Sequence, residues 1–145
     1  MKATQLSGYE HLLGIAEGAI APPSIFATMG MLKLELIAGS VKIHCKASEQ
    51  HCNPMGGVHG GFAATVIDSV TGCAVHSLLE AGVGYGTVDL SVKMMRPVPL
   101  GEALIAEAKV THLSRAIGIA EATVRRTDGT LLASGSATCY IKRPN

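Results

Sequence analysis

The sequence predicts an α+β fold in which a curled antiparallel sheet wraps around a long central helix. Residues 60–79 are apolar on nearly every side, and a helix of that kind has to be covered on several faces. Segments of alternating apolar and polar residues, typical of half-buried strands, lie before and after it. A chain of 145 residues can bury one core of its own. We therefore expect a single domain over 1–145, in which residues 1–28 form an N-terminal helix and lead-in.

A short helix and a β-hairpin are expected ahead of the central helix. Ser7 and Glu10 have the spacing of a capping box, and apolar residues follow at helical intervals until Pro22-Pro23 ends the helix. Residues 32–36 and 41–47 then alternate in polarity on the two sides of a Gly-Ser pair. This pattern predicts two strands joined by a tight turn.

The central helix and four further strands complete the predicted order. The helix spans about Gly60 to Leu79, and the glycines that follow it are typical of a helix end. Pro97 ends the first of the four strands, and Asp128-Gly129 signals a tight turn before the last one. We expect these strands to form a meander with one apolar face, made of Val88, Leu90, Val92 and Met94, then Leu104, Ala106, Ala108 and Val110, then Ala120, Ala122 and Val124, then Leu131, Ala133, Ala137, Cys139 and Ile141.

The composition excludes several classes of function. Aromatic residues make up only 3% of the chain and Trp is absent, which disfavours ligand stacking on aromatic platforms. The formal charge of +1 lacks the basic excess expected of a nucleic-acid-binding protein. Asp68, Gly72 and His76 interrupt the longest apolar run, so no membrane span is expected. Residues 1–5 show no apolar region of a secretory signal.

The cysteines predict free thiols in a reducing cytoplasm rather than disulfides. The four residues, Cys45, Cys52, Cys73 and Cys139, form no C-x-x-C pair. A zinc site is the alternative, because His44, His51 and His59 lie nearby, but none of these residues has the usual ligand spacing. We expect no metal ion and no cofactor.

A glycine-rich loop leads into the central helix and carries the clearest functional signal. It reads Asn53-Pro-Met-Gly-Gly-Val-His59-Gly60-Gly61, and Asp68 is the only charged residue in the apolar run that follows. Burying a carboxylate costs several kcal/mol unless it is partnered or neutralised, so such residues are often functional. The alternative is an Asp at an exposed edge of the helix.

The spacing of Gly60 and Asp68 indicates a site made by two chains. Asp68 lies eight residues after Gly60, which is roughly 12 Å along a helix. The free amides of a helix N-terminus suit an oxyanion or a polarised carbonyl. One reacting carbon cannot touch both groups of the same chain. We therefore expect helices paired about a two-fold axis, and thus an oligomer.

These residues resemble the hotdog-fold acyl-CoA thioesterases, specifically the phenylacetate-pathway type. The resemblance covers roughly residues 30–141 and rests on Asn53-x-x-Gly56-x-x-His59-Gly60-Gly61, on Asp68, and on the later Thr87-Val88-Asp89 and Arg96-Pro97 segments. It implies a sheet around a central helix, two protomers with a continuous sheet, and a homodimer or homotetramer.

The resemblance also implies a role for each site residue. The Gly60 amide polarises the thioester carbonyl of an acyl-CoA substrate, and Asn53 and His59 shape that pocket. Asp68 of the partner protomer activates water or attacks directly, and Thr87 helps to orient the water. An amide of this kind contributes about two to three orders of magnitude in rate, and a carboxylate base about 10² to 10⁴.

Each residue also has a structural interpretation. Asn53 is a common turn former, the two glycines permit close packing, and His59 could hold the loop. A hydratase or dehydratase of acyl thioesters is the first alternative function, although the helical acid here is an Asp, nine residues after His59. A non-catalytic acyl-CoA binding module is the second. The sequence leaves open the acyl group, the residues that bind the coenzyme A nucleotide, and whether Asp68 is nucleophile or base.

Overall fold

The computed structural model describes residues 6–145, so the prediction about a secretory signal at residues 1–5 lies outside the described part. In this described part, three α-helices, a short 3₁₀ turn and six strands follow one another as α1 (Gly8–Ala16), α2 (Ser24–Thr28), β1 (Met31–Ile37), β2 (Ser40–Cys45), the 3₁₀ turn Glu49–His51, α3 (Gly60–His76), β3 (Gly84–Met94), β4 (Leu104–Leu113), β5 (Ile117–Arg126) and β6 (Leu131–Lys142). Within these residues no helix is long and apolar enough to cross a membrane.

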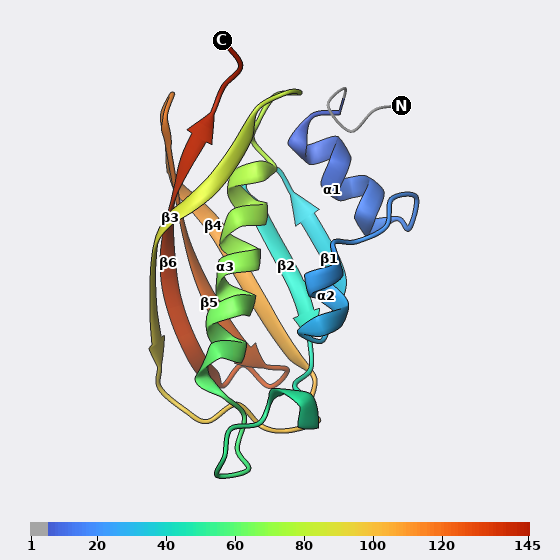
Figure 1. Cartoon of the computed structure of the whole chain (residues 1–145), viewed down its shortest axis with the longest axis vertical. Helices are drawn as coiled ribbons and strands as arrows, with labels where there is room; N and C mark the ends of the chain where they lie inside the picture. The colour runs from blue at the N-terminus through green and yellow to red at the C-terminus, as the bar shows by residue number, and fades with distance from the viewer. Residues whose placement is uncertain (1–5) are drawn as a thin grey trace.

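One antiparallel sheet of six strands wraps around α3, as predicted (Figure 1). Its strand order is β1-β2-β4-β5-β6-β3. Side chains of α3 and of the inner sheet face form a single core of mostly aliphatic residues, with Phe62, Ile67 and Leu104 among its largest members. The sheet therefore holds α3 along its length and fixes where each residue of the helix points.

The N-terminal part agrees with the predicted capping box and adds a helix. The Ser7 hydroxyl accepts from the Glu10 amide at 3.1 Å, and the Glu10 carboxylate accepts from the Ser7 amide at 3.0 Å. After Pro22-Pro23 the chain forms α2, which the sequence analysis did not predict. Because α2 spans only five residues, it carries too little periodicity to be recognised.

The predicted meander is correct for β4, β5 and β6 but wrong for β3. Strand β3 pairs with β6 at the far edge of the sheet, not with the strand that follows it in the chain. Residues 95–103 run across the lower end of the molecule in Figure 1 to connect β3 with β4. Such a crossover leaves no local pattern in the sequence.

Two irregularities in the pairing shift the predicted inward-facing residues. In β3 the register breaks at Val88, so Tyr85 and Thr87 face inward before the break and Leu90 after it. At the start of β6 a similar break puts Leu132, not Leu131, into the core with 1% exposure. A bulge inserts one residue and inverts the alternation, which a strict period of two does not anticipate.

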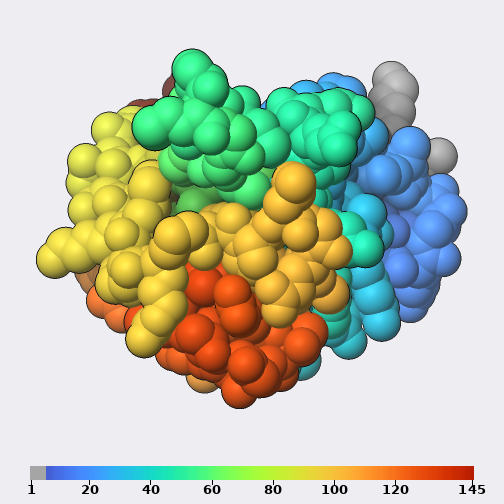
Figure 2. Space-filling model, turned by 90° about the horizontal axis from the view of Figure 1, so that it is seen from below, coloured from blue at the N-terminus to red at the C-terminus, as the bar shows by residue number. Residues whose placement is uncertain are grey.

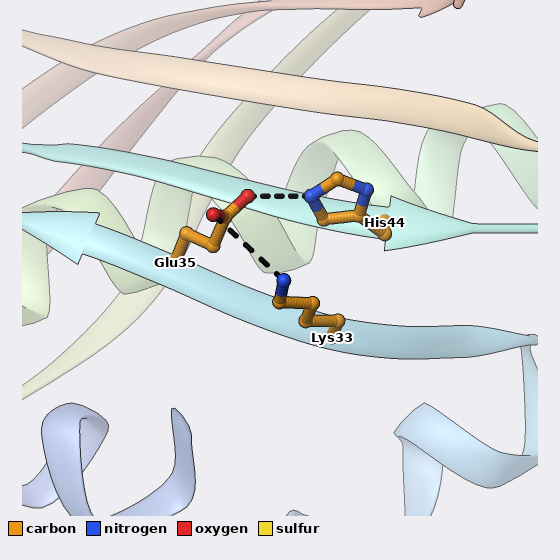
Figure 3. A network of polar contacts seen from close by, with 3 residues as sticks. All are labelled: Lys33, Glu35 and His44. Carbon is orange, nitrogen blue, oxygen red and sulfur yellow. Dashed lines mark hydrogen bonds and ion pairs between the residues drawn. The ribbon is translucent and has the colours of Figure 1, made fainter. Parts of the chain in front are cut away.

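The two edge strands of the sheet, β1 and β3, differ in whether other elements pack against them. Strand β1 is flanked by α1 and α2 and carries the charged residues Lys33 and Glu35, as expected of a protected edge (Figure 1). Glu35 Oε2 lies 2.5 Å from His44 Nε2, and Oε1 lies 4.0 Å from Lys33 Nζ (Figure 3). The hydrogen bond with His44, followed by the charge of Lys33, lowers the pKa of Glu35. At the opposite edge, β6 is the only neighbour of β3 among the strands of residues 6–145.

Candidate active site

Asn53 organises the loop that leads into α3. Its side-chain oxygen accepts from the Met55 amide at 2.9 Å and from the Gly57 amide at 3.2 Å, while its own amide donates to the Gly57 carbonyl at 2.7 Å. Gly56 within this turn has a φ of 88°, a conformation that favours glycine. The Asn53 oxygen is thus committed to the loop, and its NH₂ group has no hydrogen-bond acceptor among the described residues.

His59 caps the N-terminus of α3. Its Nδ1 accepts from the Gly61 amide at 2.7 Å, and its backbone carbonyl accepts from the Phe62 amide at 2.9 Å. A Cβ at position 61 would lie 2.8 Å from His59 Nδ1, so a glycine there lets the ring approach the helix end. The Gly60 amide has no acceptor in the described part of the chain and is a free donor at this end of the helix.

His51 also holds this loop in place, a role that the sequence analysis did not predict. Its Nε2 donates to the Thr28 carbonyl at 2.8 Å, Nδ1 accepts from the Ser48 amide at 2.9 Å, and its own carbonyl accepts from the His59 amide at 2.7 Å. Residues 54–57 of this loop are exposed, and the loop (green) lies at the end of the molecule that Figure 2 views from below. A loop held at both ends can keep the Gly60 amide in a fixed direction.

Asp68 lies two turns along α3 and is half-buried rather than fully enclosed. The Thr87 hydroxyl donates to Asp68 Oδ1 at 2.9 Å. The bulge at Val88 follows Thr87 directly, and bulges are common beside active sites because they redirect side chains. Asp68 therefore has a hydrogen-bonded partner and an open side, the combination that a carboxylate base or nucleophile needs.

The neighbouring thiols are poor competitors for a nucleophilic role. Burial, and next the negative charge of Asp68, raises the pKa of Cys73 to about 12. Burial also raises the pKa of Cys139, whose sulfur lies 4.0 Å from the Thr87 hydroxyl. Both thiols are protonated near neutral pH, and a protonated thiol is a weak nucleophile.

The structure thus brings the predicted site residues into two groups. Asn53, His59 and Gly60 gather at the N-terminus of α3, and Asp68 farther along this helix pairs with Thr87 of β3. In residues 6–145 no cluster of three or more His, Cys, Asp or Glu could hold a metal ion.

Comparisons with known proteins identify the family. Residues 55–133 match the thioesterase superfamily, a stretch that includes Gly60, Asp68 and Thr87. The chain belongs to this superfamily. Its α+β architecture is the hotdog fold predicted from the sequence, and membership makes it a thioester hydrolase.

Similar proteins support this assignment. Acyl-coenzyme A thioesterase 13 of mouse is 31% identical over 107 residues, covering 72% of this chain and 76% of the relative. A phenylacetic acid degradation-related protein of Ralstonia eutropha has a solved structure with a TM-score of 0.81 and 27% identity, covering 90% of this chain and 98% of that one. A thioesterase family protein of Silicibacter pomeroyi has a TM-score of 0.79 and 27% identity, with coverage of 92% and 99%.

Proposed function

We propose that the chain is an acyl-CoA thioesterase that hydrolyses aromatic or medium-chain acyl-CoA thioesters to the free acid and coenzyme A. The observation that carries this proposal is the 2.9 Å hydrogen bond from Thr87 of β3 to Asp68 of α3, a helix whose first amide, that of Gly60, has no acceptor among the described residues. The similarity to the mouse acyl-coenzyme A thioesterase and to the Ralstonia phenylacetic acid degradation-related protein supports the substrate class.

A second copy of the chain is proposed to complete the site by pairing along the free edge of β3. Apolar side chains are exposed there, with Val88 at 64% and Met94 at 52% exposure. An unpaired strand edge with exposed apolar side chains is a ready site for another strand. Antiparallel pairing of two β3 strands would extend the sheet across a two-fold axis.

This pairing would bring the Gly60 end of α3 in one copy close to the Asp68–Thr87 pair of the other. Gly60 lies against Met94, since a Cβ at position 60 would be 2.9 Å from the Met94 sulfur, and Asp68 lies against Thr87. If the two-fold axis passes near Ser91, Met94 of one chain stands opposite Thr87 of the other, because the bulge takes Val88 out of the pairing. The Gly60 amide of one copy would then face the Asp68 carboxylate of its partner.

The chemistry follows from these two groups. The Gly60 amide, with the Asn53 NH₂ beside the same loop, would donate hydrogen bonds to the thioester oxygen as negative charge develops on it. Asp68 either takes a proton from an attacking water or attacks the carbonyl carbon itself, while Thr87 orients the carboxylate and the water. The carbon–sulfur bond then breaks, and the coenzyme A thiolate leaves and takes up a proton. If Asp68 has attacked directly, the acyl group is left as a mixed anhydride on its carboxylate, and water then hydrolyses the anhydride to the free acid and restores Asp68.

A free-thiol release assay on a panel of acyl-CoA thioesters tests this function. We expect release from phenylacetyl-CoA, hydroxybenzoyl-CoA or medium-chain acyl-CoA. Binding of acyl-CoA without thiol release would favour the binding module, and hydration of an enoyl-CoA without thiol release would favour the hydratase. A homotetramer in the cytoplasm remains part of the proposal, supported by the four free cysteines and by the free β3 edge.

A further inference from the structure

Strand β3 carries two charged side chains, Asp89 and Lys93, on the outer face of the sheet. On β6 they stand opposite Thr138 and Ser134, so neither meets an opposite charge on the neighbouring strand. Both are exposed, and neither takes part in an ion pair among residues 6–145. Strand β3 lies at the edge of the sheet, with β6 as its one neighbour among the described strands (Figure 1). The two charges are therefore available to a strand that pairs with the free edge.

The positions of the two charges on β3 are symmetric about Ser91. Asp89 lies two residues before Ser91 and Lys93 two residues after it, and the strand is regular between them because its bulge lies before Asp89. When a strand pairs antiparallel with a second copy of itself, residues equally far from the two-fold axis stand opposite each other. An axis at Ser91 therefore puts Asp89 of each copy opposite Lys93 of its partner.

Among pairings whose axis lies within residues 89–93, only an axis at Ser91 brings opposite charges together. An axis at Leu90 puts Asp89 opposite Ser91, and an axis at Val92 puts Lys93 opposite Ser91. An axis at Asp89 or at Lys93 puts like charges directly opposite each other, which destabilises a sheet. The charges therefore favour one register over its neighbours.

The inner face of β3 suits the same register. With the axis at Ser91, Leu90 of each copy stands opposite Val92 of its partner, and apolar side chains meet on the side of the core. Leu90 is 38% exposed in the single chain, so this contact would cover an apolar surface that is otherwise open to water. This is also the register that puts Met94 opposite the partner's Thr87, on which the two-chain site depends.

We propose that two ion pairs, each between Asp89 of one copy and Lys93 of the other, set the register in which the β3 edges of two copies pair. This inference rests on the proposed function, in which a second copy completes the site. The pairs select a second copy of this chain as the partner, because its charges follow the same order along the strand. Asp89 and Lys93 are positioning residues, which bring Gly60 to the partner's Asp68 and do not touch the substrate.

Reversing one charge of the pair tests this inference. Lys93→Glu puts two carboxylates opposite each other, and Asp89→Lys puts two ammonium groups there. We expect the dissociation constant of the dimer, measured by analytical ultracentrifugation, to rise about tenfold or more in each variant. Added salt should weaken the wild-type dimer and strengthen the Lys93→Glu dimer, because it screens attraction and repulsion alike. Lys109→Glu, an exposed change of the same charge on β4, is the matched control and should leave the dissociation constant unchanged.

Mixing the two charge variants gives a sharper test, because their defects are complementary. The Asp89→Lys chain carries two positive charges along this edge, and the Lys93→Glu chain carries two negative ones. A hybrid dimer therefore has two attractive pairs, whereas each variant alone has two repulsive ones. We expect native mass spectrometry to show mainly hybrid dimers, and thiol release to return at a protein concentration where each variant alone is dissociated. A statistical mixture of dimers would contradict the inference.

Crosslinking measures the register directly. A residue on the axis stands opposite itself with its two Cα atoms about 4.5–5.5 Å apart, a separation that a disulfide can span. Ser91→Cys should therefore form a crosslinked dimer on mild oxidation. In Asp89→Cys the two introduced thiols would be about four residues apart along the strands, roughly 13 Å, and should not crosslink. A dimer of Ser91→Cys that does not crosslink would show that the axis lies elsewhere.

The outcomes separate this inference from the proposed function. If the dissociation constant responds to charge as expected but the wild type releases no thiol, the register is confirmed and the proposed thioesterase activity is wrong. If thiol release continues while Lys93→Glu and Asp89→Lys dimerise as tightly as Lys109→Glu, the register inference is wrong and the proposed function stands. A wild type that is active only as a monomer would overturn both the two-chain site and this register.

Discussion

The Thr87 hydroxyl donates a 2.9 Å hydrogen bond to Asp68 Oδ1 of the same chain. This contact joins β3 to α3 at the position where the strand is interrupted by its bulge. It fixes one oxygen of the carboxylate and leaves the other free to face a substrate. A carboxylate held in this way loses little conformational freedom when it reacts.

Replacing Asp68 by Asn should abolish most of the thioesterase activity without unfolding the protein. The two side chains have the same shape, and the Asn oxygen can still accept from Thr87, but the amide is neither a base nor a nucleophile. We expect turnover to fall by about 10² or more, measured by thiol release. Asp128→Asn, in the exposed turn before β6, is the control and should retain activity. Equal activities in the two variants would make Asp68 a structural residue.

Thr87→Ala should be less damaging than Asp68→Asn. A hydrogen bond to a charged group contributes about 1.5 kcal/mol, which corresponds to about tenfold in turnover. Thr87→Ser keeps the hydroxyl and should stay close to wild type in the same assay. A serine variant as slow as the alanine variant would show that the Thr87 methyl group, and not its hydroxyl, is required.

The sequence alone predicts the features that depend on short-range interactions. The capping box at Ser7, the start of α3 at Gly60 and the glycine-rich loop all depend on short-range chemistry, and the structure has them where the pattern indicates. The central helix ends at His76, three residues earlier than predicted, because Ser77 caps it while the apolar pattern continues to Leu79. Helix ends are set by such caps more than by polarity.

The resemblance names Asp68 and Thr87 as site residues, but the direct contacts between distant segments could not be predicted from the sequence. The Asp68–Thr87 pair depends on β3 pairing with β6 and on the bulge at Val88, neither of which has a sequence period. Tyr85 precedes Val88, the first apolar residue of the expected strand, so the sequence does not indicate that it contacts α3. The close approach of the Tyr85 phenol to Gly72 is likewise seen only in the structure.

The stability of the fold should fall as the pH falls below about 6.5, because of His76. Burial, followed by the nearby His11, lowers the pKa of His76 in the folded state. His11 Nδ1 lies 3.2 Å from His76 Nε2, and Tyr85 is the other titratable group against this ring. As the pH falls through the ordinary histidine value, the unfolded chain therefore binds the proton first, and the free energy of unfolding decreases.

Denaturant unfolding at about pH 7.5 and about pH 5.5 measures this effect. We expect the difference in free energy of unfolding between the two pH values to shrink in His76→Asn. His112→Asn is the matched control, because His112 is exposed on β4, and it should leave the difference unchanged. A His76→Asn protein with the same pH dependence as wild type would contradict the prediction.

Gly8→Ala should destabilise the docking of α1 against the end of α3. A Cβ at position 8 would lie 1.7 Å from the His76 carbonyl oxygen, and the Gly8 amide donates to the Leu79 carbonyl at 2.9 Å. Overpacking of this kind typically costs about 1–3 kcal/mol in the free energy of unfolding. Gly84→Ala is the control, because nothing lies within 4 Å of a Cβ there. Equal stabilities would mean that α1 can move away without cost.

Mixing two inactive variants should restore activity if the site is shared between two chains. Asn53→Ala damages the Gly60 side of the site, and Asp68→Ala removes the carboxylate. After subunit exchange, each hybrid dimer has one intact site, made by Asn53 of one chain and Asp68 of the other, and one site with both defects. Because random exchange makes about half of the dimers hybrid, activity should recover to roughly a quarter of wild type.

The mixing experiment needs proof that exchange has taken place. Labelling one variant with heavy isotopes and measuring the dimers by native mass spectrometry supplies it. Two samples of the same variant, mixed in the same way, are the control and should stay inactive. If hybrid dimers form and no activity returns, Gly60 and Asp68 do not act across a two-fold axis. The Asp68–Thr87 pair would then have to work with a carbonyl-binding group of its own chain other than the Gly60 amide, because that amide is roughly 12 Å away along α3.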